Sequence, residues 1–299
     1  MPNIKQHLKR FRVPVDGKFK LKDHDPGWNG DEKYSEDERR QMAEQVLTEG
    51  VEELSEAQNL LYASDTWSVL AIFQAMDAAG KDGTIKHVLS GVNPQGCQVY
   101  SFKQPSSEEI DHDFLWRCAK ALPERGRIGI FNRSYYEEVL VVKVHPEFLH
   151  AQRLPESDVS TPKFWEHRYK SINNFERHLA RNGTRIVKFF LNVSKEEQKR
   201  RFVERLNDPK KHWKFSPSDV AERARWDDYM AAYEEMLRAT TTKWAPWYVI
   251  PADHKWAARA AVAAILTHEI KRLDLKYPEP SDAVKASLEE SRKKLEAEE

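Results

Sequence analysis

A loop of small residues follows the apolar segment 67–73 and has the features of a phosphate-binding loop. It reads Ala75-Met76-Asp77-Ala78-Ala79-Gly80-Lys81-Asp82-Gly83-Thr84. Where a strand ends in a glycine-containing turn that opens a helix, unpaired N–H groups and the positive helix end point at an anion. Gly80 and Gly83 permit close backbone approach, and Lys81 can reach between two phosphates. We therefore expect residues 78–84 to bind phosphate; an ordinary strand-to-helix turn with an accidental Gly-Lys pair is the alternative.

The loop departs from the usual pattern at two positions. Ala75 stands where the first glycine is usual, and Asp82 stands where a magnesium-binding serine or threonine is usual. An acidic side chain beside a polyanion is repulsive unless a cation lies between them. Mg²⁺ binds a few carboxylate oxygens together with water and phosphate oxygens, so Asp77 and Asp82 are candidate metal ligands. The alternative for Asp82 is a carboxylate that the helix N-terminus favours.

A second polar motif, Asn132-Arg133-Ser134-Tyr135-Tyr136-Glu137-Glu138, follows the third apolar segment. The carboxyl ends of neighbouring parallel strands line one crevice. Arg133 would therefore face the same phosphates as Lys81, where a guanidinium can bridge two oxygens. Glu137 has three interpretations, as a residue that serves the metal, that serves a nucleotide, or that favours a helix start. A surface Arg-Ser-Tyr turn is the alternative for the whole motif.

A basic set of residues follows the fourth apolar segment. Its members are Lys195, Lys199, Arg200, Arg201, Arg205, Lys210, Lys211 and Lys214. Arg201 and Arg205 are four residues apart and share a helix face. Charge runs of this kind are usually solvated faces, but a basic segment beside a phosphate-binding loop is also typical of a lid that closes on phosphate. Both interpretations stay open for each residue.

Short apolar segments alternate with helical patterns along the chain. We predict strands at 67–75, 97–102, 127–132, 185–192 and 245–251. The first and fourth are nearly continuous in apolar residues, as in strands that are covered on both faces. Alternating strands and helices predict right-handed crossovers, and hence an α/β fold with a parallel five-stranded sheet between two layers of helices.

Helix start signals lie between the predicted strands. A capping box at Ser35 and Glu38 precedes a long amphipathic helix, and a second box at Ser106 and Glu109 predicts a helix that ends before Pro123. Further helices are expected to start at Thr161-Pro162 (ending at Gly183), at Ser194, at Ser216-Pro217 and at Asp253, the expected cap of the last core helix.

The bulk composition excludes several classes of function. The chain of 299 residues has 48 lysines and arginines against 48 aspartates and glutamates, so a uniformly basic surface is excluded and nucleic-acid binding is disfavoured. The N-terminus lacks the apolar core of a signal peptide, and no segment is long and apolar enough to span a bilayer. Cys97 and Cys118 show no metal-ligand spacing, and we interpret them as buried free thiols. These features predict a cytoplasmic protein without a membrane partner.

The two polar motifs resemble those of the type-2 polyphosphate kinases. The segments 74–83 and 131–137 carry the resemblance, which extends through Gly91-Val92-Asn93-Pro94, 187–191, Trp213-Lys214-Phe215 and 245–252. It covers about residues 35–275. The family implies a three-layer α/β/α, P-loop kinase-like fold with a helical lid, here at about 195–225. Residues 1–34 would then be an irregular N-terminal arm and residues 276–299 a charged C-terminal tail.

The resemblance also implies an activity. Family members transfer phosphoryl groups between inorganic polyphosphate and nucleotides with Mg²⁺, for which Mn²⁺ is an alternative. Many have Asp-Arg at the third strand end, whereas Asn132-Arg133 resembles the subgroup that acts on both AMP and ADP. The implied reaction converts AMP and ADP to ADP and ATP reversibly, with GMP and GDP as further acceptors. A homo-oligomer, dimer or tetramer, is implied as well.

The resemblance and the motifs together assign expected roles. Asp77, Lys81 and Arg133 are the expected catalytic residues, and Asp77, Asp82 and Glu137 are expected to share the metal. Polyphosphate is expected to contact Lys81, Arg133, Arg201, Arg205, Lys210, Lys211 and Lys214. The nucleotide is expected to contact Asp82, Lys103, Arg117, Asn132 and Glu137.

Two rival functions stay open at this point. An ATP-dependent nucleoside monophosphate or deoxynucleoside kinase would share the fold. A non-catalytic polyphosphate-binding regulatory protein would bind without turnover, and the presence of Lys81 and Arg133 disfavours it.

Overall fold

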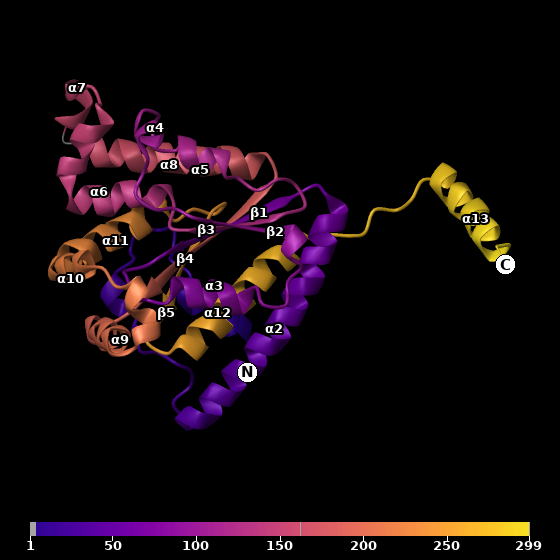
Figure 1. Ribbon diagram of the computed structural model, residues 1–299, viewed down its shortest axis with the longest axis horizontal. Coiled ribbons are helices and arrows are strands. Elements are labelled where there is room, and N and C mark those ends of the chain that lie inside the picture. Colours follow the sequence, from indigo (N-terminus) through magenta and orange to yellow (C-terminus); the bar gives the residue numbers. More distant parts are fainter. Residues whose placement is uncertain (1–3, 162, 299) are drawn as a thin grey trace.

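A parallel five-stranded sheet forms the centre of the computed structural model, which describes residues 4–161 and 163–298 (Figure 1). Its strands are β1 (Ser68–Gln74), β2 (Cys97–Ser101), β3 (Ile128–Asn132), β4 (Thr184–Asn192) and β5 (Trp247–Pro251), in the order β2-β3-β1-β4-β5. All strand pairings are parallel. The five strands predicted from the apolar segments are confirmed, with ends that differ by at most two residues.

The register of the central strands determines where polar residues meet. Phe73 of β1 pairs with Asn132 of β3, and Gln74 of β1 pairs with Phe190 of β4. Every residue of β1 is buried, because the strand lies in the middle of the sheet with helices on both faces. The loops that leave β1 and β3 therefore begin at the same level of the same edge.

Helices cover both faces of the sheet, so the expected three-layer α/β/α fold is confirmed. On one side α12 (Lys255–Lys271) packs on β4 and β5 and against α2 (Glu36–Ser64) and α3 (Lys81–Val88). On the other, α8 (Phe164–Arg181) packs on β4, with α11 (Trp226–Thr240) beside it. None of the described helices is long and apolar enough to cross a membrane.

Shorter elements connect these layers. The segment expected to form a lid contains α9 (Lys195–Asn207), η5 (Pro209–Lys214) and α10 (Pro217–Ala224). The others are α1 (Ile4–Phe11), η1 (Leu21–Asp23), η2 (Pro94–Gly96), α4 (Ser107–Ile110), α5 (Trp116–Lys120), η3 (Tyr135–Val139), α6 (Val141–Val144), η4 (Pro146–Gln152), α7 (Glu156–Val159) and α13 (Asp282–Glu296).

The capping signals were informative at most helix starts. The box at Ser35 forms with Glu38, and Ser194, the predicted start of another helix, accepts the N–H of Glu197. The box at Ser106 also forms, but it opens only the four-residue α4, and a separate helix, α5, follows at Trp116. Pro162, part of another predicted start, lies outside the described residues; α8 begins at Phe164 after Lys163.

Asp253 does not cap the last core helix, contrary to the prediction. The residue before α12 is His254, which makes no side-chain cap, and the Asp253 carboxylate instead accepts the backbone N–H of Ser194 at 2.8 Å. The carboxylate therefore joins the end of β5 to the start of α9, a long-range contact that local sequence cannot reveal.

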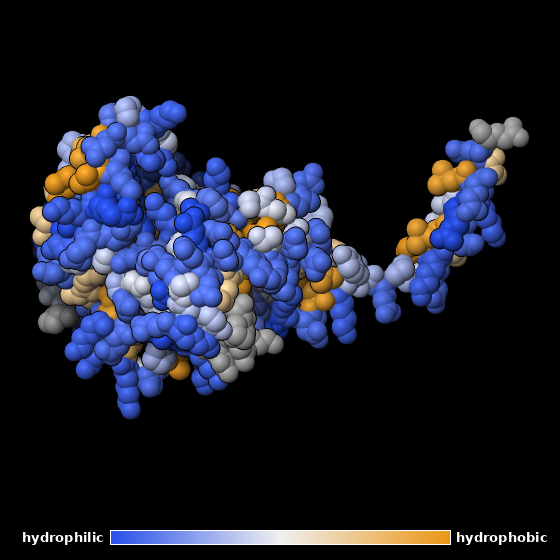
Figure 2. Space-filling view, turned by 90° about the horizontal axis from the view of Figure 1, so that it is seen from below, coloured by the Kyte–Doolittle hydropathy of each residue, from blue (hydrophilic) through white to orange (hydrophobic). Residues whose placement is uncertain are grey.

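The charged C-terminal tail contains a helix. Helix α13 has no buried residue and lies away from the body of the protein (Figures 1 and 2). Its apolar side chains Val284, Leu288 and Leu295 are all exposed. The sequence-based domain boundaries around it stay a prediction.

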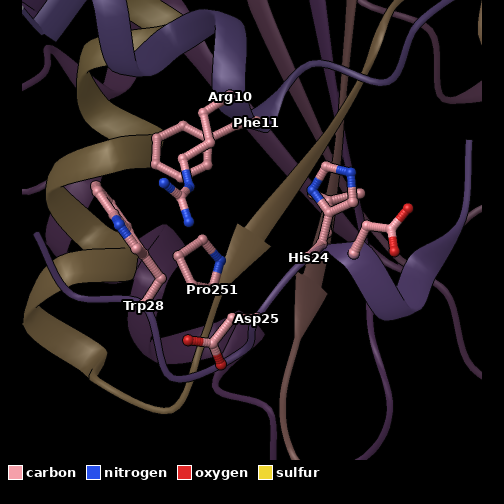
Figure 3. A pocket seen from close by; sticks show the side chains of 8 residues that line it. Arg10, Phe11, His24, Asp25, Trp28 and Pro251 are labelled. Carbon is pink, nitrogen blue, oxygen red and sulfur yellow. The ribbon is translucent and has the colours of Figure 1, made fainter.

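The N-terminal arm is more ordered than expected, since it includes α1 and η1. Phe11 and Val13 are buried, and the N–H of Val13 donates to the carbonyl of Trp247 in β5 at 2.9 Å. The arm leaves a cavity of about 150 Å³ against β5, where the Phe11 and Trp28 rings meet edge to face (Figure 3). The arm was predicted to be irregular because charged, proline and glycine residues dominate its composition, although a few apolar side chains anchor it.

A buried ion pair lies beneath the second polar motif. The ammonium group of Lys188 is 2.6 Å from Glu176 and also donates to Tyr136 and to the carbonyl of Thr240, each at 2.8 Å. Glu176 accepts the hydroxyls of Tyr135 at 2.9 Å and Tyr136 at 2.7 Å. Burial lowers the pKa of Lys188, and the charge of Glu176 opposes this effect. The network fixes the turn that directly follows Arg133.

Removing one partner of this pair should destabilise the fold strongly. Lys188→Met leaves the Glu176 carboxylate buried without its cation, which costs about 3–5 kcal/mol in the free energy of unfolding. Urea unfolding measures the loss. The double variant Lys188→Met with Glu176→Leu should recover most of it, and the surface variant Lys271→Ala should change stability by less than about 0.5 kcal/mol. A loss below about 1 kcal/mol for Lys188→Met would contradict the structural role of the pair.

Candidate active site

The phosphate-binding loop joins β1 to α3 and has an unusual backbone conformation. Gly80, the residue before α3, has a φ of +103°, and Ala78 has a φ of +61°. Glycine adopts such angles freely, whereas at Ala78 the conformation is strained. Left-handed residues that alternate with right-handed ones turn successive N–H groups to one side, which creates an anion-binding concavity.

The side chain of Lys81 is buried against its own loop. Its Nζ donates to the carbonyl of Ala75 at 2.8 Å and lies 3.4 Å from that of Met76. Burial, and next the charge of Arg133, lower the pKa of Lys81 to about 8 against the opposing effect of nearby carboxylates. Lys81 is therefore a cation at neutral pH whose charge is lost a little above it.

Arg201 binds the outer side of the same loop. One terminal nitrogen donates to the carbonyls of Ala78 at 3.0 Å and Ala79 at 2.7 Å. The other donates to the carbonyls of Ala252 at 2.6 Å and Asp253 at 3.0 Å, and Nε donates to Glu197 at 2.7 Å. A guanidinium has five N–H groups, so protein acceptors occupy all of them.

Arg133 leaves β3 in a left-handed conformation, with a φ of +66°. Its N–H donates to the carbonyl of Phe73 at 3.0 Å, which holds the turn against β1. The guanidinium is 2.7 Å from an oxygen of Asp77 and 3.4 Å from one of Glu137. The charges of Glu137 and Asp77 raise the pKa of Arg133 against the effect of burial. The structure thus brings the two expected polar motifs together.

Asp82 has different partners from Asp77 and Glu137. The amide of Asn132 donates to Asp82 at 2.8 Å, and Lys214 of the expected lid lies 3.6 Å from its other oxygen. Burial by itself would raise the pKa of Asp82, but these two partners outweigh burial and lower it. Of the three expected metal ligands, Asp77 and Glu137 therefore bind Arg133, whereas Asp82 binds Asn132. Within residues 4–161 and 163–298 no group of three or more acidic, histidine or cysteine side chains converges as a preformed metal site.

Two cavities meet at these residues. The loop cavity, of about 650 Å³, is lined by residues 77–83 and by the expected lid. The side cavity, of about 470 Å³, is lined by residues of the segments that follow β1, β2 and β3 and by residues of α10 and α11. Both are lined by Asp77, Phe102, Lys103, Arg133 and Asp219. A molecule in one cavity would therefore meet a molecule in the other at Asp77 and Arg133.

The two cavities separate the residues predicted from sequence. The loop cavity is lined by Asp77, Ala78, Ala79, Gly80, Lys81, Asp82, Gly83, Lys103, Asn132, Arg133, Arg201, Arg205, Lys211 and Lys214. Of these two cavities, Arg117 and Glu137 line the side cavity and not the loop cavity. Thr84 is buried in α3, and Lys210 lines neither cavity; its N–H caps η5 by donating to Asp208.

Several lining residues were not predicted. In the side cavity Tyr229 and Tyr233 of α11 provide aromatic surface, and Phe148 of η4 adds more. The spacing of four between the tyrosines indicates a shared helix face, but nothing local indicates what that face meets. Lys255 in the loop cavity follows the carboxyl end of β5, so the rule that located Arg133 could have found it.

Comparison with known proteins identifies the family. Residues 35–278 match the model of the polyphosphate kinase 2 (PPK2) family. The chain is 52% identical over 297 residues to an ADP-polyphosphate phosphotransferase of Rhodopseudomonas palustris, covering 98% of this chain and 99% of that protein. It is 43% identical over 276 residues to an AMP/ADP-polyphosphate phosphotransferase of Meiothermus ruber, covering 92% and 97%.

The fold agrees with that of a solved relative. The crystal structure of polyphosphate kinase 2 from Arthrobacter aurescens TC1 superposes with a TM-score of 0.82 and is 40% identical, covering 94% of this chain and 95% of that one. The match of the family model to most of the chain, the high identities and the shared fold lead to one conclusion. This chain belongs to the polyphosphate kinase 2 family.

Proposed function

We propose that this chain transfers phosphoryl groups from inorganic polyphosphate to AMP and ADP, giving ADP and ATP in a reversible, Mg²⁺-dependent reaction. The observation that carries the proposal is the meeting of two chemically different cavities at Asp77 and Arg133. The names of the relatives, an ADP- and an AMP/ADP-polyphosphate phosphotransferase, support the same pair of substrates. GMP and GDP are further candidate acceptors, and one relative is named a GDP-polyphosphate phosphotransferase.

The lining of each cavity suits one substrate. The loop cavity is rich in cations, among them Lys81, Arg205, Lys211 and Lys214, and so suits a chain of phosphates. The side cavity combines aromatic rings with the polar side chains of Arg117 and Glu137, as expected of a nucleoside site. Of the expected nucleotide contacts, Asp82 and Asn132 line the loop cavity instead and would reach only the phosphate end.

Catalysis would depend on position and charge. The attacking atom is a phosphate oxygen that is already ionised at neutral pH, so no general base is needed. Lys81 and Arg133 would hold the transferring group and offset its negative charge while the two substrates are aligned. Because one phosphoanhydride is exchanged for another, the reaction would run in either direction.

A divalent metal fits the junction of the cavities. Phosphotransferases of this kind generally need one, and Mg²⁺ takes few protein ligands because phosphate and water oxygens complete its shell. Asp77 is part-exposed there, and only one of its two oxygens is bound by Arg133. Asp77 would therefore hold the metal, with Glu137 or Asp82 as further ligands; when bound, the metal would neutralise charge on the phosphate oxygens.

Arg201 and Arg205 would differ in role although they share α9. Arg201, an expected polyphosphate contact, has all its donors on protein acceptors and would support the loop. Arg205 lines the loop cavity, and its guanidinium donates to Asp219 and to the carbonyl of Lys214, at 3.2 and 3.1 Å. Arg205 would therefore contact polyphosphate. A homo-oligomeric state and a cytoplasmic location stay predictions.

An assay without ATP tests the function. Purified protein with AMP, Mg²⁺ and polyphosphate should produce ADP and then ATP. Lys81→Ala or Arg133→Ala should lower kcat by at least about 10³-fold, because each removes a charge that stabilises the transferring group. Circular dichroism should show an intact fold, and Lys271→Ala should keep wild-type turnover. Product formation only when ATP is supplied would support the rival ATP-dependent kinase, and binding without turnover would support the regulatory protein.

The orientation of the two substrates can be tested at Arg205. Arg205→Ala should raise the KM for polyphosphate about tenfold while changing the KM for AMP less than about twofold, since Arg205 lines the loop cavity and not the side cavity. Steady-state kinetics with each substrate varied in turn measures both constants. A rise in the AMP constant instead would mean that the nucleotide occupies the loop cavity.

The pH dependence should report Lys81. Its pKa is lowered to about 8, so the group is charged below that pH and neutral above it. The kcat/KM for polyphosphate should therefore be level from pH 7 and fall about tenfold per pH unit above about 8. The phosphates themselves, with a pKa near 6, are already ionised there. A profile that stays level to pH 9.5 would show that the charge of Lys81 is not needed for binding.

A further inference from the structure

Two cations lie at the start of α12, next to the site described above. Lys255 and Arg259 are four residues apart and share a helix face. Among the residues that the structure describes, neither forms an ion pair, whereas the neighbouring Arg200 and Arg201 both bind Glu197. The carboxylates near Lys255 and Arg259 are thus already bound to other cations.

Both side chains lie beside the phosphate-binding loop. Lys255 lines the loop cavity and not the side cavity. Helix α3 packs against α12 (Figure 1), and a Cβ placed on Gly83 would lie 3.7 Å from a terminal nitrogen of Arg259. The same test at Gly80 gives 3.6 Å to Arg201. Cations therefore lie next to both glycines of the loop.

This arrangement is electrostatically unfavourable without an anion. Burial lowers the pKa of both Lys255 and Arg259, and the positive charge of Arg201 lowers each of them further, while the charges of Glu204 and Glu197 oppose this effect at Lys255 only in part. Like charges held together at a protein surface are destabilising unless a negative charge is added. A polyanion that leaves the loop cavity past Gly83 would supply that charge to both side chains.

We propose that Lys255 and Arg259 form a distal subsite for the polyphosphate chain, beyond the phosphates held by the loop. The proposal rests on the proposed function, since it takes inorganic polyphosphate as the ligand. A nucleotide in the side cavity would not contact the subsite, because neither Lys255 nor Arg259 lines that cavity. Lys255 lines the loop cavity but Arg259 does not, so only a chain that continues beyond the loop cavity contacts both cations, and the subsite favours long chains.

Chain length provides the test. For the double variant Lys255→Gln with Arg259→Gln, the dissociation constant of long-chain polyphosphate should rise about tenfold, and that of tripolyphosphate should change less than about twofold. Isothermal titration calorimetry measures both, and the KM values for the two ligands should follow the same pattern. The long-chain effect should shrink as salt is added, because these cations are partly exposed.

Control variants separate charge from folding. Lys255→Arg with Arg259→Lys keeps both charges and should bind long chains as the wild type does, and Lys271→Ala removes a cation at the far end of α12 without effect. If the double variant does not fold, Lys255→Gln alone replaces it, because that position is exposed. This single variant should raise the dissociation constant of long-chain polyphosphate about threefold.

An unchanged long-chain constant, or equal rises for both ligands, would overturn the subsite. If the wild type binds polyphosphate but transfers no phosphoryl group, the proposed function fails while the binding comparison still decides the subsite.

Discussion

A loop that offers its N–H groups to an anion must find donors elsewhere for its carbonyl oxygens, and the rest of this structure depends on that requirement. Arg201 binds the carbonyls of Ala78 and Ala79, and Gln198 binds that of Asp77 at 3.0 Å. Both donors come from α9, the first helix of the expected lid. Unpaired buried carbonyls would cost free energy, so the loop has its shape only while α9 is in place. The base of the lid is therefore part of the phosphate site and not a separate flap.

Contacts with distant segments likewise hold Arg133 in position. Its left-handed backbone is held by the bond to Phe73 in β1 and by the buried network beneath Tyr135 and Tyr136. Its guanidinium is shared between Asp77 and Glu137, so phosphate oxygens would compete with carboxylates for the same donors. Arg133 is thus held in place before any substrate arrives, which lowers the entropic cost of aligning two polyanions.

The parts of the site that could be predicted from sequence are those that one segment determines by itself. A strand, a turn and a helix start make the loop 75–84, and the strand-end rule places Arg133 beside it. The parts that were missed depend on contacts between distant segments. From sequence Asp253 resembles a helix cap, but its carboxylate binds the start of α9. From sequence Arg201 resembles a solvent-exposed cation, but its guanidinium donates to backbone carbonyls. The side cavity is assembled from segments more than a hundred residues apart, so no window of sequence contains its outline.

Charge balance connects the site to its selectivity. The chain has a formal net charge of zero, so it has no broad positive field that would attract every polyanion. Around the loop, most cations already have a carboxylate partner, as Arg133 has in Asp77 and Arg205 has in Asp219. A phosphate must displace the carboxylate of such a pair and gains only the difference, whereas a phosphate beside an unpaired cation gains the whole interaction. Beyond the phosphates that Arg133 and Arg205 contact, affinity for a longer chain should therefore depend on those described cations that have no carboxylate partner, and their positions rather than their number determine which polyanion fits.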